Sequence, residues 1–192
     1  MRQDVPVLIV ADAQRWSRWL AEHGRESKGV WLVLAKKGTV EPTSLSYDQA
    51  LAEAICHGWV DGQLSKGDEQ TFRRRFTPRR PGSAWSKRNV LLANQLLDAG
   101  KVRPGGLAAI ERAKAEGTWA QAYDGQAAIG MQPDLASALA ANPSALTMFE
   151  ELDAANRYTV LYRVATAKRE ETRRRRVEQF VAMLARGDKP RP

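Results

Sequence analysis

The spacing of apolar side chains along this 192-residue chain changes at about residue 77. Before that point, short segments alternate between apolar and polar residues or are continuously apolar, and both patterns predict β-strands. The apolar run at residues 29–36 is too short for a helix that is buried on two sides, so it predicts a central strand. We expect strands at residues 6–10, 29–36, 59–64 and 71–76.

Helical spacing separates these strands and dominates the rest of the chain. Trp16, Trp19 and Leu20 form an i, i+3, i+4 stripe, and Ser46 followed by Gln49 is a capping box that begins a helix. The pattern predicts an α+β fold: a small antiparallel or mixed sheet of three or four strands in the N-terminal half with covering helices, then an all-helical C-terminal half. We expect the later helices at residues 86–99, 104–116, 134–141 and 143–152, around 160–164, and across 177–187.

A stretch of small residues between positions 125 and 133 predicts a boundary, because it offers few side chains to anchor it. We expect residues 1–125 to form an α+β domain that carries a groove lined by arginine and tryptophan. Residues 133–187 are expected to form a helical C-terminal subdomain packed on that domain.

The chain is basic, with 30 Lys and Arg against 22 Asp and Glu and a net charge of +8. This balance favours anionic partners, although a solubilising surface charge is the alternative explanation. Cys56 is the only cysteine, so no intrachain disulfide can form, which is typical of a reducing compartment. The apolar run at residues 5–10 is far too short to cross a membrane. We therefore expect a cytoplasmic protein without a transmembrane segment.

The segment from Ser46 to Lys87 combines arginines and aromatic residues more densely than a plain core requires. Guanidinium groups bind phosphate and carboxylate through two hydrogen bonds, and aromatic rings can stack on a base or another ring. The alternative is a solvated edge strand that its charges protect from aggregation. The side chains concerned are Phe72, Arg73, Arg74, Arg75, Phe76, Arg79, Arg80, Trp85 and Lys87, together with Trp59.

Asp61, between Val60 and Gly62, has two interpretations. It could face a pocket as an acid, a base or a group that orients an arginine, or it could form a structural ion pair or turn cap. An ion pair suits a carboxylate among five arginines better than proton transfer does.

Cys56 and His57 are neighbours on a predicted helix and point about 100° apart, so they cannot form a hydrogen-bonded dyad with each other. We expect Cys56 to be buried and structural. One Cys and two His supply too few ligands for a zinc or iron site. The chain also has no glycine-rich phosphate loop and no serine nucleophile elbow, so we expect no metal and no cofactor.

Four consecutive arginines, Arg173 to Arg176, resemble a nucleic-acid-binding patch. Glu170 and Glu171 lie four residues before Arg174 and Arg175, which predicts two i, i+4 ion pairs. Arg173 lies on the apolar stripe of its helix and should point to the next layer, where a salt bridge between the two halves or a ligand contact would lie.

Several motifs together resemble the YdeI/OmpD-associated family of bacterial proteins, whose members are also labelled bacteriocin-protection proteins. Over most of the chain, from Trp16 to about Leu184, the resemblance is carried by motifs that begin at Tyr47, Cys56, Phe76, Ser83, Gly100 and Ala167. Relatives often have an aromatic residue where this chain has His57. The resemblance implies a link to resistance against bacteriocins and cationic antimicrobial peptides, and no reaction or catalytic residues.

We therefore expect a protein that binds an anionic small molecule or phosphorylated ligand, and not an enzyme. Two alternatives stay open: a nucleic-acid-binding protein that uses the same basic strand, and an enzyme acting on an anionic small molecule through Asp61 and Lys87. The expected ligand-binding residues are Trp59, Asp61, Arg74, Arg79, Arg80, Trp85, Lys87 and Arg173.

Overall fold

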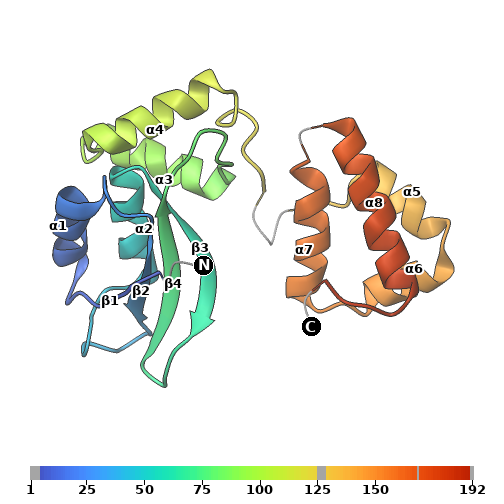
Figure 1. The fold of residues 1–192 in the computed structure, drawn as a ribbon, viewed down its shortest axis with the longest axis horizontal. Helices are drawn as coiled ribbons and strands as arrows, with labels where there is room; N and C mark the ends of the chain where they lie inside the picture. Colours follow the sequence, from blue (N-terminus) through green and yellow to red (C-terminus); the bar gives the residue numbers. More distant parts are fainter. Residues whose placement is uncertain (1–4, 125–128, 168, 191–192) are drawn as a thin grey trace. The chain divides into compact units, whose positions relative to one another are not determined.

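The computed structural model describes residues 5–124, 129–167 and 169–190. The chain divides into two compact units, Met1–Ala122 and Tyr123–Pro192, which we call the N-terminal unit and the C-terminal unit. Figure 1 shows a sheet with helices in the first and helices in the second. Residues 125–128, at the start of the stretch predicted to be a boundary, lie outside the described residues.

The N-terminal unit contains a four-stranded sheet in the order β1-β2-β4-β3. β1 and β2 are parallel, whereas β4 is antiparallel to both β2 and β3, so the sheet is mixed and β2 is a central strand as predicted. A register shift between Asp61 and Leu64 interrupts the pairing of β3 with β4. The strands are β1 (Val7–Leu8), β2 (Val30–Ala35), β3 (Trp59–Lys66) and β4 (Thr71–Pro78).

Four helices accompany this sheet, and each begins where the sequence pattern predicts (Figure 1). The hydroxyl of Ser46 accepts a hydrogen bond from the backbone N–H of Gln49, and the Gln49 side chain accepts one from the N–H of Ser46, which completes the predicted capping box. The helices are α1 (Ala13–His23), α2 (Tyr47–Cys56), α3 (Lys87–Asp98) and α4 (Pro104–Ala115).

Helix α2 contributes to both hydrophobic clusters of the N-terminal unit. Ala50 and Ala54 pack with α1 and one face of the sheet, where Trp16 and Phe76 are fully buried. Leu51 and other residues on the opposite side of α2 pack against α3 and α4. Because α2 is buried from two sides, it connects the sheet layer to the second pair of helices.

Backbone contact between the end of α2 and the start of α4 depends on two glycines. Gly58 follows α2 with a φ of +80°, a conformation that favours glycine. A Cβ atom at Gly106 would lie 2.3 Å from the carbonyl oxygen of Cys56. The N–H of Arg103 donates to that same oxygen at 2.9 Å. The two helix ends therefore approach more closely than side chains would permit.

The C-terminal unit is helical, which confirms the predicted fold class. Its core contains Leu135, Phe149, Val160 and Phe180, one from each helix, and α8 contacts the other three helices. In the described part of the chain, no strand follows β4. The helices are α5 (Pro133–Ala140), α6 (Pro143–Glu150), α7 (Ala154–Ala165) and α8 (Glu170–Ala185).

Replacement of Gly106 by alanine should lower the free energy of unfolding by about 1–3 kcal/mol, because the new methyl group would overlap the Cys56 carbonyl. The loss should appear although alanine has the higher helix propensity. Urea unfolding monitored by circular dichroism measures it. Gly130→Ala is the matched control, since nothing lies within 4 Å of that position. Equal stability of the two variants would contradict the proposed close contact.

Candidate functional site

The two tryptophans expected in a ligand groove lie inside the N-terminal unit. Trp59 and Trp85 are each 2% exposed and belong to different hydrophobic clusters. Trp59 packs edge-on against Trp16 and Trp19, with ring centroids 6.1 and 5.8 Å apart. Their rings therefore stabilise the core in this structure.

Asp61 forms an ion pair, one of the two roles predicted for it. Arg74 donates from Nη2 to Oδ2 of Asp61 at 2.6 Å and from Nε at 3.1 Å. The hydroxyl of Tyr47, the first residue of α2, donates to the same oxygen at 2.8 Å. Asp61 and Phe76 are register partners, which places Asp61 and Arg74 on the same face as the core. This cluster joins β3, β4 and α2 at the edge of the sheet.

The cluster also changes the acidity of Tyr47. Burial, with a further contribution from the negative charge of Asp61, raises the pKa of the Tyr47 hydroxyl to about 12. The Arg74 guanidinium lies 4.8 Å from the centroid of the Tyr47 ring. Tyr47 is therefore a neutral hydrogen-bond donor at physiological pH.

Arg79 is only 6% exposed and stacks on Trp85, with its guanidinium carbon 3.5 Å from the ring centroid. Its Nη1 donates to the carbonyl oxygen of Ala84, and its own carbonyl oxygen accepts from Arg112. This cation–π contact and these hydrogen bonds fix the loop after β4. Arg79 therefore contributes to the packing of that loop on α4.

The remaining predicted residues of the sheet half point to the surface. Arg80 and Lys87 are exposed. Arg73 and Arg75 lie on the sheet face opposite Arg74, as the strand period predicts, and Arg75 is the register partner of Trp31. The basic segment is thus divided between the core face, the opposite face and the loop. Of the predicted residues, Arg79, Arg80 and Trp85 line one small cavity of about 10 Å³ beside α4.

Arg173 lies in the C-terminal unit and forms a two-pronged ion pair with Asp134 of α5. Its Nε donates to Oδ2 at 2.6 Å and its Nη2 to Oδ1 at 2.7 Å. The hydrogen bonds from Arg173 are the main reason that the pKa of Asp134 is lowered, and they raise the pKa of Arg173. Arg173 therefore forms a salt bridge, but it joins α5 to α8 within the C-terminal unit and not the two halves of the chain, as was predicted.

The predicted i, i+4 pairs of α8 are wrong in their partners. Arg174 Nε lies 3.8 Å from Oε1 of Glu178, which follows it, and among the described residues no ion pair joins Arg174 to Glu170. In the part of the chain that the structure describes, Arg175 forms no ion pair with Glu171. Arg175 is exposed, and the next residue, Arg176, is partly buried.

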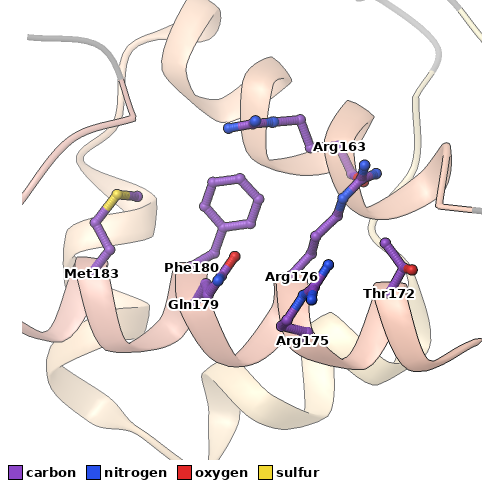
Figure 2. Close-up of a pocket in the computed structure, with 7 residues that line it drawn as sticks. All are labelled: Arg163, Thr172, Arg175, Arg176, Gln179, Phe180 and Met183. Atoms are coloured by element: carbon purple, nitrogen blue, oxygen red, sulfur yellow. The ribbon is translucent and has the colours of Figure 1, made fainter.

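A basic pocket lies between α7 and α8, with a volume of about 430 Å³. Figure 2 shows the side chains of Arg163 and Arg176 on the same side of α8 as the ring of Phe180. Arg176 donates from Nη1 to the carbonyl oxygen of Arg163, and the guanidinium carbon of Arg163 lies 6.0 Å from the centroid of the Phe180 ring. We call this the α7–α8 pocket. It is lined by Arg163, Thr172, Arg175, Arg176, Gln179, Phe180 and Met183.

None of the described residues that line the α7–α8 pocket is acidic. Within the described residues, Arg163, Arg175 and Arg176 also form no ion pair with a carboxylate. The sequence reasoning singled out the arginines of α8 but not Arg163, because only the packing of α7 on α8 brings it to them. No local pattern around Arg163 signals this role.

Cys56 is buried, as predicted. Burial raises the pKa of its thiol to about 11, so the nucleophilic thiolate is scarce at neutral pH. His57, the next residue, shares a hydrogen bond with Ser17 of α1. In the described residues, no group of three or more His, Cys, Asp or Glu side chains could hold a metal ion, and no helix is both long and apolar enough to cross a membrane.

Raising the pH from about 10 to about 12 should destabilise the wild-type protein more than the variant Tyr47→Phe. The hydroxyl of an unfolded tyrosine ionises near pH 10, whereas that of folded Tyr47 has a pKa of about 12. The stability that this group contributes is therefore complete below about pH 10 and is lost as the pH rises to about 12. The excess loss should be about 2 kcal/mol. Urea unfolding across this pH range measures it, and parallel curves for both proteins would contradict the assignment.

Comparison with known proteins adds two family matches. Residues 8–109, more than half of the chain, match the family described as a domain of unknown function, DUF8412. Residues 128–187 match OmdA, described as bacteriocin-protection, YdeI or OmpD-associated. No curated protein and no solved structure matches the chain.

These matches confirm the predicted family and locate it more narrowly. The OmdA match includes the α7–α8 pocket and Arg173, whereas the motifs from Tyr47 to Leu107 fall within the other match. The chain therefore belongs to the DUF8412 family of unknown function, and its helical C-terminal part is a YdeI/OmpD-associated (OmdA) domain.

Proposed function

We propose that this protein binds a small anionic ligand, a phosphate or carboxylate compound, in the α7–α8 pocket. The observation that carries the proposal is the set of three arginines around one cavity whose described lining residues include no acid. Arginine suits this role because its planar group offers two parallel donors to an oxyanion and does not lose its charge.

The other lining residues support a ligand with a polar and an apolar part. Thr172 and Gln179 can donate or accept hydrogen bonds, and Phe180 and Met183 provide an apolar wall (Figure 2). A volume of about 430 Å³ lies within the usual range of small-molecule sites. These features favour a metabolite over a polymer.

The alternative, nucleic-acid binding, would use a different surface, the outer face of the sheet in the N-terminal unit. Trp31 lies opposite Arg75, and Val33 opposite Arg73, on the sheet face away from the main core. Arg73 is exposed and Trp31 is partly exposed, so a stacked base and its phosphate could both find a partner there. We propose this face as the site that a short oligonucleotide would use.

The link to bacteriocin protection is best explained as indirect. At a net charge of +8, the protein repels a polycation, and screening over about 8 Å leaves only a local acidic patch to overcome that repulsion. The sequence contains no acidic run of that kind. We therefore propose that an anionic ligand, and not the peptide, is the binding partner, and that binding takes place in the cytoplasm.

Calorimetric titration of the full chain with a panel of phosphorylated metabolites should identify a compound that binds. The double variant Arg175→Ala, Arg176→Ala should bind that compound at least about tenfold more weakly, because each charge-assisted hydrogen bond contributes about 1.5–3 kcal/mol. Arg174→Ala is the matched control, because Arg174 is on the same helix, is paired with Glu178 and does not line the pocket. Its affinity should equal that of the wild type.

Two outcomes would contradict this proposal. One is metabolite binding that all three proteins share. The other is that no metabolite binds, whereas an oligonucleotide binds to the wild type with an affinity that falls steeply as salt rises. Loss of this oligonucleotide binding in the double variant Arg73→Ala, Arg75→Ala would favour the nucleic-acid alternative.

Purified protein should not bind cationic antimicrobial peptides at micromolar concentrations, because both partners are positively charged. Calorimetry with such a peptide at physiological salt, and again at low salt, is the measurement. Repulsion predicts weaker association at low salt. Micromolar binding that strengthens as salt falls would overturn the indirect mechanism.

A further inference from the structure

A second cavity lies in the N-terminal unit, where α1, the end of α2 and the start of α4 meet. Its volume is about 530 Å³. We call it the His57 cavity, because His57 and Ser17 are its candidate hydrogen-bonding pair. Its lining residues are Gln14, Ser17, Arg18, Leu20, Ala21, Gly24, Arg25, His57, Arg103, Pro104 and Gly105.

The position of the cavity follows from the close packing of α2 and α4. Gly58 and Gly106 allow the two helix ends to touch, and this brings His57, the C-cap of α2, beside Arg103, the N-cap of α4. Arg103 makes no side-chain capping bond. The partly positive start of a 12-residue helix therefore faces the same cavity as the Arg103 side chain.

Three cationic side chains line the cavity, while Glu53 of α2, which does not line it, acts on His57. Arg18 comes from α1, Arg25 from the turn after α1 and Arg103 from the start of α4, and each is exposed enough to move towards a ligand. None of the described lining residues is acidic. Three cations from three separate segments favour an oxyanion as a ligand.

Ser17 and His57, both lining residues of this basic cavity, form the hydrogen-bonding pair. His57 Nε2 and Ser17 Oγ are 3.2 Å apart, and both residues are partly buried. Burial is the main reason that the pKa of His57 is lowered; Arg103 lowers it further, and Glu53 on α2 opposes both. The groups that face His57 are thus Ser17, Glu53 and Arg103, and a neutral imidazole can accept or donate a hydrogen bond beside the cations.

We propose that the His57 cavity binds the phosphate group of a small phosphorylated metabolite, with Arg18, Arg25 and Arg103 as charge partners and the Ser17–His57 pair as hydrogen-bonding partner. This site is independent of the α7–α8 pocket, because it belongs to the other unit and shares no residue with it. A bound dianion offsets the repulsion from Arg103 and stabilises the imidazolium. Binding therefore strengthens as the pH falls through the titration range of His57.

NMR titration of the full chain with sulfate tests this site. Sulfate keeps its double charge from about pH 5 to about pH 8, so any pH dependence comes from the protein. The ring signals of His57 should shift, its pKa should rise when sulfate binds, and affinity should be at least about threefold higher at about pH 5.5 than at about pH 7.5. His23, exposed and stacked on Trp19, is the internal control and should not respond.

Three variants separate the contributions. His57→Phe, which keeps a planar ring, should retain the fold by circular dichroism but lose the pH dependence of sulfate binding. Arg103→Ala should weaken binding at every pH. Arg175→Ala, Arg176→Ala should leave the His57 response unchanged, which makes failure of this site distinguishable from failure of the α7–α8 pocket.

The competing results are equally specific. An equal response of His23 and His57, or a His57 response that survives Arg103→Ala at full strength, would overturn the site. Adenosine monophosphate and glucose 6-phosphate should compete with sulfate at lower concentration than inorganic phosphate does. If inorganic phosphate competes as well as both, the assignment to a phosphorylated metabolite is wrong.

Discussion

The burial of α2 from two sides is the constraint on which the N-terminal unit depends. Ala50 and Ala54 are fully buried against the sheet layer, while Leu51 and Ile55 are buried against α3 and α4. Small residues on one side let the sheet approach, and larger ones on the other fill the space between helices. Because one helix serves two clusters, a shift of α2 would disturb both at once.

Two polar clusters of the unit lie at the two ends of this helix. Tyr47 begins α2 and bonds to Asp61 and thus indirectly to Arg74, whereas His57 follows its last turn and faces a basic cavity. At the first end, the charges of Asp61 and Arg74 neutralise each other inside the protein, which explains that cluster as structure. At the second end, the cations converge without an acidic residue in the described lining, which is why that end carries the proposal of a ligand.

The sequence predicted the elements well because periodicity, caps and glycines are local signals. The capping box at Ser46 and the strand alternation of Phe72, Arg74 and Phe76 all appear in the structure. The sequence could not show which arginines and tryptophans are buried, because composition does not reveal which of these side chains pack against each other. Arg79 stacks on Trp85, and both side chains are buried. Composition alone cannot distinguish such a buried pair from an arginine and a tryptophan that line an open groove.

Whether an arginine is available to a ligand depends on whether the fold supplies it with an acidic partner. Arg74 has Asp61, and Arg173 has Asp134, so both already have a counter-charge that a ligand would need to displace. Arg175 lies two residues after Arg173 on the same helix, but it is exposed and lines a cavity with no acidic residue among those described. Neighbouring arginines of one run therefore differ in availability because successive helical positions face different partners.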